Sequence, residues 1–178
     1  MKETDKQMKE TAERMKETDR QMKETDRQMK ETDKRVGAIT NRFGEMVEYM
    51  IAPNLVTKFD ELDFTFTKAN RTKITDRKNG IFVEVDAFLE NGEEVMIVEI
   101  KAKPNTDDIN DHIERMEKLR RYADLHGDKR KYLGAMAGVV FDEGVKTYTL
   151  KKGFYVIEPA GDTFKITEPK GKYHPRAW

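Results

Sequence analysis

The chain has 178 residues with 34 basic and 34 acidic side chains, so its formal net charge is zero and no bulk electrostatic attraction to nucleic acid is expected. It contains no cysteine, which excludes disulfides, thiolate catalysis and cysteine-based zinc sites. The sequence has no apolar run long enough to span a membrane, and its N-terminus does not resemble a secretory signal, so it predicts a soluble, cytoplasmic protein.

Residues 1–35 are five copies of a seven-residue repeat, MKETDKQ MKETAER MKETDRQ MKETDRQ MKETDKR. Methionine opens every copy and threonine follows three residues later, which are heptad positions a and d of a coiled coil. A strict seven-residue period predicts a left-handed supercoil with a partner. The seam is weak because threonine buries little area and methionine specifies packing poorly. Two interpretations therefore stand: a homo-oligomerisation stalk, or a solitary helix stabilised by charge pairs four residues apart.

The apolar pattern continues in phase after the repeat, starting at Val36. We therefore expect the helix to run from the repeat, 1–35, into the first helix of a globular domain, 36–178, and to end at Pro53. In the segment GEMVE of this helix, Glu48 lies near the edge of the apolar stripe.

The globular part alternates predicted helices and strands. Residues 62–66 are predicted to be extended, and residues 68–80 are polar and predicted to be a loop. The other predicted elements are two strands around Asn91-Gly92 (81–90 and 93–103), a helix (106–127), a buried strand (131–141), a short helix ended by Gly153, and two closing strands about Gly161-Asp162. This order predicts an α/β domain with a mixed sheet, in which a helix crosses over from the hairpin to the next strand.

Charged side chains interrupt the two strands of the hairpin at Glu84, Asp86, Glu99 and Lys101. A two-residue loop at Asn91-Gly92 places all four on one face, with Asp86 and Glu99 as diagonal neighbours. The other face then carries Val83, Val85, Val98 and Ile100. A four-residue loop keeps these faces and sets Asp86 directly opposite Glu99, whereas a three-residue loop breaks the arrangement.

Carboxylates packed this closely repel unless a cation lies between them or one of them holds a proton. Two carboxylates and a backbone carbonyl are suited to magnesium, which keeps several of its waters. With Lys101 on the same face, these groups are the ingredients of metal-assisted phosphodiester hydrolysis. The alternative is a solvated sheet face held by Glu–Lys pairs across the strands.

The segment VEVDAFLENGEEVMIVEIKAK resembles the core of the PD-(D/E)XK nuclease superfamily, the restriction-endonuclease-like fold, with Asp86 and the Glu-x-Lys of Glu99 to Lys101 as its signature. Residues 36–167 resemble a prokaryotic branch of that superfamily in which a coiled-coil leader precedes the nuclease-like domain. The resemblance implies an αβββαβ core with a mixed central sheet. It departs from the common pattern at Val85, where many members have proline.

The resemblance also implies roles for individual residues. Asp86 and Glu99 would bind Mg²⁺, or Mn²⁺ in its place, together with the carbonyl of Ile100, and Glu48 would support the ion. Lys101 would orient or activate the attacking water. These roles predict a metal-dependent DNA endonuclease, and the alternative is a catalytically inactive interaction protein with a nuclease fold and a coiled-coil stalk.

The predicted helix 106–127 carries further candidates. Arg115 and Lys118 are expected to contact the DNA backbone, and the alternative is a solvated helix face shared with neighbouring glutamates. His112 is expected to be structural or exposed, and the alternative is that it assists near the metal. The tail with Tyr173 and Trp178 is expected to dock on the domain, with stacking on bases as the alternative.

Overall fold

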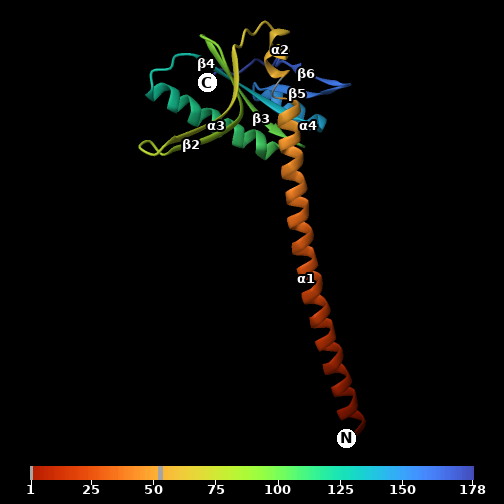
Figure 1. Cartoon of the computed structure of the whole chain (residues 1–178). Coiled ribbons are helices and arrows are strands. Elements are labelled where there is room, and N and C mark those ends of the chain that lie inside the picture. The colour runs from red at the N-terminus through yellow and green to blue at the C-terminus, as the bar shows by residue number, and fades with distance from the viewer. Residues whose placement is uncertain (1, 52–53) are drawn as a thin grey trace. The chain divides into compact units, whose positions relative to one another are not determined.

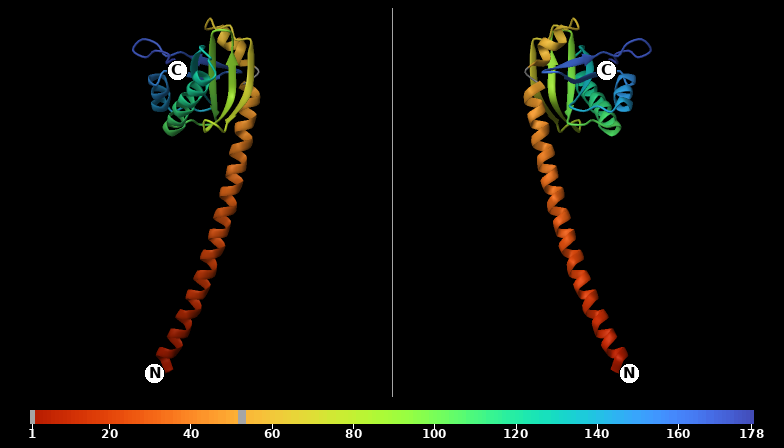
Figure 2. Two further views of the ribbon diagram at one scale, coloured as in Figure 1. Left: turned by 90° about the vertical axis from the view of Figure 1, so that its left-hand side faces the viewer. Right: turned by 90° about the vertical axis from the view of Figure 1, so that its right-hand side faces the viewer.

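The computed structural model describes residues 2–51 and 54–178, and it describes side chains for residues 4, 6–34 and 54–178. The chain divides into two compact units, Met1–Arg42 and Phe43–Trp178. Helix α1 (Lys2–Ile51) is one continuous element, as the in-phase repeat predicted (Figure 2). The predicted helix end at Pro53 and the side chain of Glu48 lie outside the described residues. Within those residues, the structure contains no helix with the length and apolarity needed to cross a membrane.

The repeat forms a helix whose own polar groups are paired along its surface. Ion pairs one turn apart link Arg20 to Glu17 at 3.1 Å and Arg27 to Glu24 at 2.8 Å. They join positions c and f of the heptad, three residues apart, whereas the sequence predicted charge pairs four residues apart. All of these side chains are exposed, so each pair contributes only weakly to helix stability.

The second unit is built on a six-stranded mixed sheet whose strands neighbour one another in chain order (Figure 1). The strands are β1 (Lys68–Asp76), β2 (Ile81–Glu90), β3 (Glu94–Lys101), β4 (Lys131–Gly138), β5 (Tyr155–Ala160) and β6 (Thr163–Thr167). The pairs β1–β2, β2–β3 and β5–β6 are antiparallel, and β3–β4 and β4–β5 are parallel. The prediction of an α/β fold with a mixed sheet is therefore confirmed.

Helices cover both faces of this sheet. Helix α3 (Thr106–Leu125) connects β3 to β4, and α4 (Glu143–Lys151) connects β4 to β5. Strands β3, β4 and β5 are parallel and lie side by side in this order. Crossover connections between parallel strands are right-handed, so α3 and α4 lie on the same face of the sheet. The buried residues of α3 and Phe154 form one core there, and α2 (Leu55–Asp60) packs into a separate core on the opposite face.

Two sequence predictions before the hairpin are wrong. Residues 68–76, within the predicted loop, form β1, which lies at the edge of the sheet and is mostly exposed on both faces. An edge strand exposed in this way can be polar throughout, so it lacks the alternating pattern of a half-buried strand. Residues 64–66 lie outside the strands, and their two phenylalanine rings pack with Phe59 of the unpredicted helix α2.

The hairpin turn is also displaced from its predicted position. The last paired residues are Glu90 and Val95, so the loop has four residues and not the favoured two. The side-chain oxygen of Asn91 accepts the backbone N–H groups of Glu93 at 2.8 Å and Glu94 at 2.7 Å. Asn91 therefore closes an Asx turn and is not one of the central residues of a type I′ turn.

Candidate functional site

A β-bulge in β2 lies at the predicted site. Between the pairs Asn70–Phe88 and Thr72–Val85, β1 advances by two residues while β2 advances by three, so Asp86 and Ala87 together face one residue of β1. A bulge of this kind reverses the alternation of side chains beyond it. Accordingly, Val85 packs in the core beneath α3, whereas Ala87 packs in the opposite core.

The bulge corrects the predicted set of four charged residues. Because of it, Val83 and Val85 lie on the same face as Val95 and Ile97 of β3, and not with Val98 and Ile100. Glu84 is 62% exposed and pairs with Lys73 of β1. Glu84 therefore points away from the α3 face and leaves the candidate site.

Asp86 and Glu99 come together where the backbone pairing of β2 with β3 ends. The last pair is Ala87 with Val98, and continuing this register by one residue sets Asp86 opposite Glu99, as the four-residue loop predicts. The Oδ2 atom of Asp86 accepts the backbone N–H of Ile100 at 2.9 Å. In a β-strand the N–H and C=O of one residue point to the same side, so the Ile100 carbonyl is directed toward the Asp86 edge as well.

Glu99 is a buried carboxylate held between two cations. Its side chain is 7% exposed, and its Oε2 atom accepts a hydrogen bond from Nη1 of Arg115 at 2.6 Å. The Nζ atom of Lys101 lies 3.2 Å from Oε1 and also 3.9 Å from Asp108 at the start of α3. Both oxygens of Glu99 are therefore engaged by positive charge.

The capping of α3 fixes this geometry. The side chain of Asn105 accepts the N–H groups of Asp107 and Asp108, and Asp108 bonds back to the N–H of Asn105. This is a capping box with Asn105 as the N-cap, so α3 begins at Thr106, where the predicted helix 106–127 begins. The helix then carries Asp108 and Arg115 toward the end of β3.

The carboxyl group of Glu99 has a strongly perturbed pKa. Burial and, after it, the negative charge of Asp86 raise the pKa of Glu99 to about 7, while the charges of Arg115 and Lys101 oppose this rise. A buried carboxyl group beside a second carboxylate titrates near neutral pH because its charged form is poorly solvated and repelled. Perturbation of this kind, with named causes, is typical of functional sites and also of structural ion-pair networks.

His112, which the sequence favoured as structural or exposed over a role near the metal, is buried beside Arg115. It is fully buried, and its Nδ1 atom lies 3.3 Å from Nη1 of Arg115. Since arginine can only donate, Nδ1 accepts and the proton is on Nε2. No acceptor lies at bonding geometry to Nε2 in the described part of the chain, although the carbonyls of Ile97 and Ala135 are near enough to favour its protonated form. Its helical spacing to Ile109 and Met116 is the sequence signal that could have assigned it to the buried stripe of the helix.

The two basic residues predicted to meet DNA differ in their surroundings. Arg115 lies inside the candidate site, 23% exposed and bonded to Glu99. Lys118 is 56% exposed and lies 4.0 Å from Glu114 on the outer surface of α3. Only Arg115 therefore joins the group formed by Asp86, Glu99 and Lys101.

Asp86 and Glu99 supply carboxylate oxygens, which are the type of donor that a divalent ion such as Mg²⁺ takes in proteins. Among the described residues, no group of three or more His, Cys, Asp or Glu side chains is arranged to hold a metal ion. Magnesium needs fewer protein ligands than such a cluster, because waters and substrate oxygens complete its shell. Asp86 uses Oδ2 for the Ile100 N–H, so binding would use its other oxygen and would compete with Arg115 for Glu99.

We expect replacement of Arg115 by methionine to raise the pKa of Glu99 above about 7, because the strongest opposing charge is removed. The measurement is a pH titration of carboxyl ¹³C signals, with Glu99→Gln to assign the signal. Lys118→Met is the matched control on the same helix and should leave the Glu99 titration unchanged. An unchanged or lower pKa in the Arg115 variant would show that the ion pair does not govern this carboxyl group.

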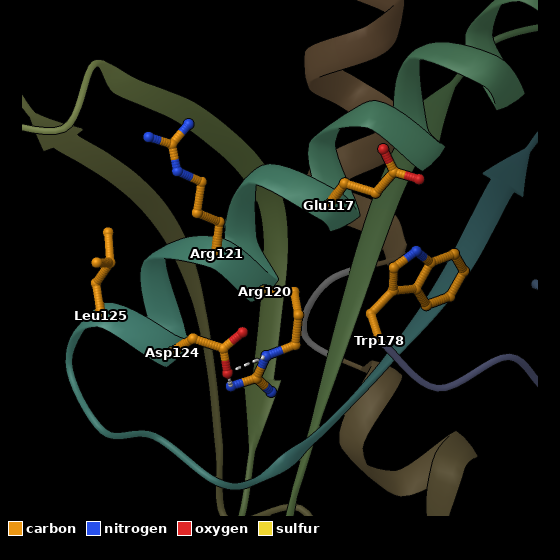
Figure 3. Close-up of a pocket in the computed structure, with 6 residues that line it drawn as sticks. All are labelled: Glu117, Arg120, Arg121, Asp124, Leu125 and Trp178. Carbon is orange, nitrogen blue, oxygen red and sulfur yellow. Dashed lines mark hydrogen bonds and ion pairs between the residues drawn. The ribbon is translucent and has the colours of Figure 1, made fainter.

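A separate shallow hollow lies on the outer side of α3 (Figure 3). Its lining residues are Glu117, Arg120, Arg121, Asp124, Leu125 and Trp178, none of which is a predicted site residue. The guanidinium of Arg120 is committed to the Asp124 carboxylate and to the carbonyls of Asp128 and Arg130. Because its best-placed cation is satisfied within the protein, this hollow is a weaker candidate than the cluster at Glu99.

Comparison with known proteins gives one match. Residues 6–83 match a family model described as "Protein of unknown function (DUF3782)", which covers less than half of the chain. The matched range ends within β2, before Asp86, Glu99 and Lys101. No curated protein and no solved structure matches the chain. The function must therefore be argued from the site itself.

Proposed function

We propose that the chain is a metal-dependent DNA endonuclease of the PD-(D/E)XK type, oligomerised through its N-terminal helix. The connectivity supports this proposal: β1, β2 and β3 form an antiparallel meander, and α3 crosses over to β4 parallel to β3. From α1 to β4 the elements follow the order ααβββαβ, because the short helix α2 lies between α1 and β1, and the αβββαβ order that the proposal requires is contained in it. The sheet then extends by β5 and β6, so the proposed core is part of a larger sheet.

The observation that carries the proposal is the pairing of Asp86 with a buried Glu99 at the point where the β2–β3 ladder opens. A purely structural sheet would continue with backbone hydrogen bonds and apolar side chains at this position. Here a carboxylate replaces the ladder bond, and a second carboxylate is buried beside it with a raised pKa. Such an arrangement costs stability, which is common where function requires it.

Each residue has a distinct role in this proposal. Asp86, Glu99 and the Ile100 carbonyl hold the divalent ion, which would stabilise charge at the phosphate and lower the pKa of a water molecule. Lys101, 42% exposed, is accessible to a phosphate or a water while its charge remains next to Glu99. Arg115 neutralises Glu99 and, when displaced from it, is within the site to contact a phosphate oxygen.

The test is a cleavage assay with magnesium or manganese on linear, supercoiled, branched and single-stranded DNA. We expect Lys101→Ala to lower the cleavage rate at least about 100-fold, since it removes a positioned charge or proton-transfer group. The Lys101 side chain is partly exposed, so the variant should keep its fold. If the parent cleaves none of these DNAs faster than the Lys101 variant, the proposal of nuclease activity is wrong.

The second candidate function is a non-catalytic interaction protein that keeps the fold and the stalk. The ion pair of Arg115 with Glu99 favours it, because that bond satisfies the buried carboxylate without a metal. Calorimetry with magnesium and manganese separates the two functions. Asp86→Asn is the appropriate variant, because an amide oxygen can still accept the Ile100 N–H while the charge is lost. If neither the parent nor the Asp86→Asn variant gives binding heat with either metal, the non-catalytic function is supported.

A further inference from the structure

The stalk presents an exposed apolar stripe. Met8, Met15, Met22 and Met29 are 56–67% exposed, and they occupy every a position of the described repeat. At the d positions, the hydroxyls of Thr11, Thr18 and Thr25 donate to the carbonyl four residues earlier, at 2.8, 2.9 and 2.9 Å. Because these hydroxyls are satisfied within the helix, each threonine offers its methyl group to a partner.

Charged groups on the outer side of the helix pair within one chain. Positions c and f form the ion pairs of Glu17 with Arg20 and of Glu24 with Arg27, and the glutamines at g also donate to these glutamates. The residues that flank the stripe differ between its two sides. In the sequence, position e holds Asp5, Ala12, Asp19, Asp26 and Asp33, and position g holds Gln7, Arg14, Gln21, Gln28 and Arg35.

These flanking residues discriminate between the orientations of two helices. An antiparallel pair sets e against e, which brings aspartates together, whereas a parallel pair sets g against the e residue of the following heptad. In register, Arg14 faces Asp19 of the second chain, and the twofold symmetry repeats this contact. A shift by one heptad leaves Arg14 opposite Asp26 in one direction and opposite Ala12 in the other, but it brings Arg35 opposite Asp33, so the number of attractive contacts is the same in both registers. The shift costs overlap instead, because only four of the five copies of the repeat then face each other.

We propose that the stalk pairs with a second copy of this chain, parallel and in register, with Arg14 of each chain facing Asp19 of the other. Each α1 continues into its own Phe43–Trp178 unit, so this pairing places two such units at the same end of the stalk. The inference rests on the part of the proposed function that assigns oligomerisation to the stalk. It does not depend on nuclease activity, and its tests measure chain pairing and not cleavage.

The chain has no cysteine, so single cysteines can report the orientation in the full-length protein. Met8→Cys and Met29→Cys chains are mixed in a glutathione redox buffer, and the same is done with Met15→Cys and Met22→Cys. We expect disulfides only between identical variants, because equivalent a residues face each other in a parallel, in-register pair. A disulfide joining Met8→Cys to Met29→Cys chains indicates an antiparallel pair, and one joining Met15→Cys to Met22→Cys chains indicates a shifted register. Either result, or no disulfide at all, overturns the proposal.

The contact between Arg14 and Asp19 is tested by charge reversal, with sedimentation as the readout. Arg14→Glu should weaken association about tenfold, since two attractive contacts become repulsive, and adding Asp19→Arg should restore most of the loss. Lys16→Glu makes the same charge change at position b, away from the stripe, and is the matched control. If the Arg14 and Lys16 variants weaken association equally, or if the double variant is weaker than Arg14→Glu, Arg14 and Asp19 do not face each other and the proposed pairing is wrong.

Discussion

The free energy of unfolding should fall steeply at acidic pH in the parent protein, and replacing His112 by leucine should abolish most of this fall. The pKa of His112 is lowered to about 3, mainly by burial and then by the charge of Arg115. In the unfolded chain the pKa of a histidine is about 6.5. Between about pH 6.5 and 3, the imidazole is therefore protonated in the unfolded state but neutral in the folded state. The parent therefore loses stability as the pH falls through this window. The full shift of about 3.5 pKa units corresponds to about 5 kcal/mol, at about 1.4 kcal/mol for each unit.

The measurement is urea unfolding of parent and variant at a series of pH values from 7.5 to 4. The quantity of interest is the difference in unfolding free energy between the two proteins, because Glu99 is present in both and its opposite dependence largely cancels. Protonation of Glu99 favours the folded state as the pH falls from 7 to 4.5, since its pKa is raised on folding. His126→Gln, which removes an exposed imidazole, is the matched control. A difference that stays constant with pH would contradict the buried, neutral histidine.

The elements that could be predicted from the sequence are those specified by residues close together in the chain. Helix α3 follows from its stripe of buried residues, and the last hairpin follows from Gly161, which adopts a left-handed φ of 63° at the turn. Strand β1 escaped prediction because its exposed edge position leaves no alternation to detect. Its pairing with β2 defines the bulge, so the bulge escaped prediction for the same reason.

Prediction of the site has the same limit. The spacing of Asp86 and Glu99 indicated that two carboxylates would meet, and the alternative four-residue loop gave their register. The loss of Glu84 from the group depends on the bulge, which is a tertiary feature. The bond of Arg115 to Glu99 depends on how α3 packs over the sheet, and no local pattern specifies that packing.

The tail docks beside α3 in a column of stacked groups that includes His112. The Trp178 indole stacks on Phe154 with ring centres 5.1 Å apart, and Phe154 stacks on His112 at 4.7 Å. Arg176 covers the other face of the indole at 4.5 Å, and the backbone N–H of Trp178 donates to the carbonyl of Tyr132. Figure 3 shows the indole beside α3 at one end of the outer hollow. The docked tail predicted from sequence is therefore observed at Trp178.

Trp178→Ala should lower the free energy of unfolding by about 2 to 4 kcal/mol, because it removes one side of the Phe154 packing and the cation–π contact. Trp178→Phe is the control, since it keeps a stacked ring while removing Nε1, which is buried and unpartnered within the described residues. That variant should be close to the parent in stability, as measured by urea unfolding of both proteins.

The same pair of variants tests whether the column reaches the carboxylates. His112 contacts both Phe154 and Arg115, so loss of the indole should loosen the Arg115–Glu99 bond and raise the pKa of Glu99, by less than Arg115→Met does. Trp178→Phe should leave that pKa unchanged. If Trp178→Ala destabilises the protein without moving the Glu99 titration, the tail stabilises the core beneath α3 but does not position the candidate site.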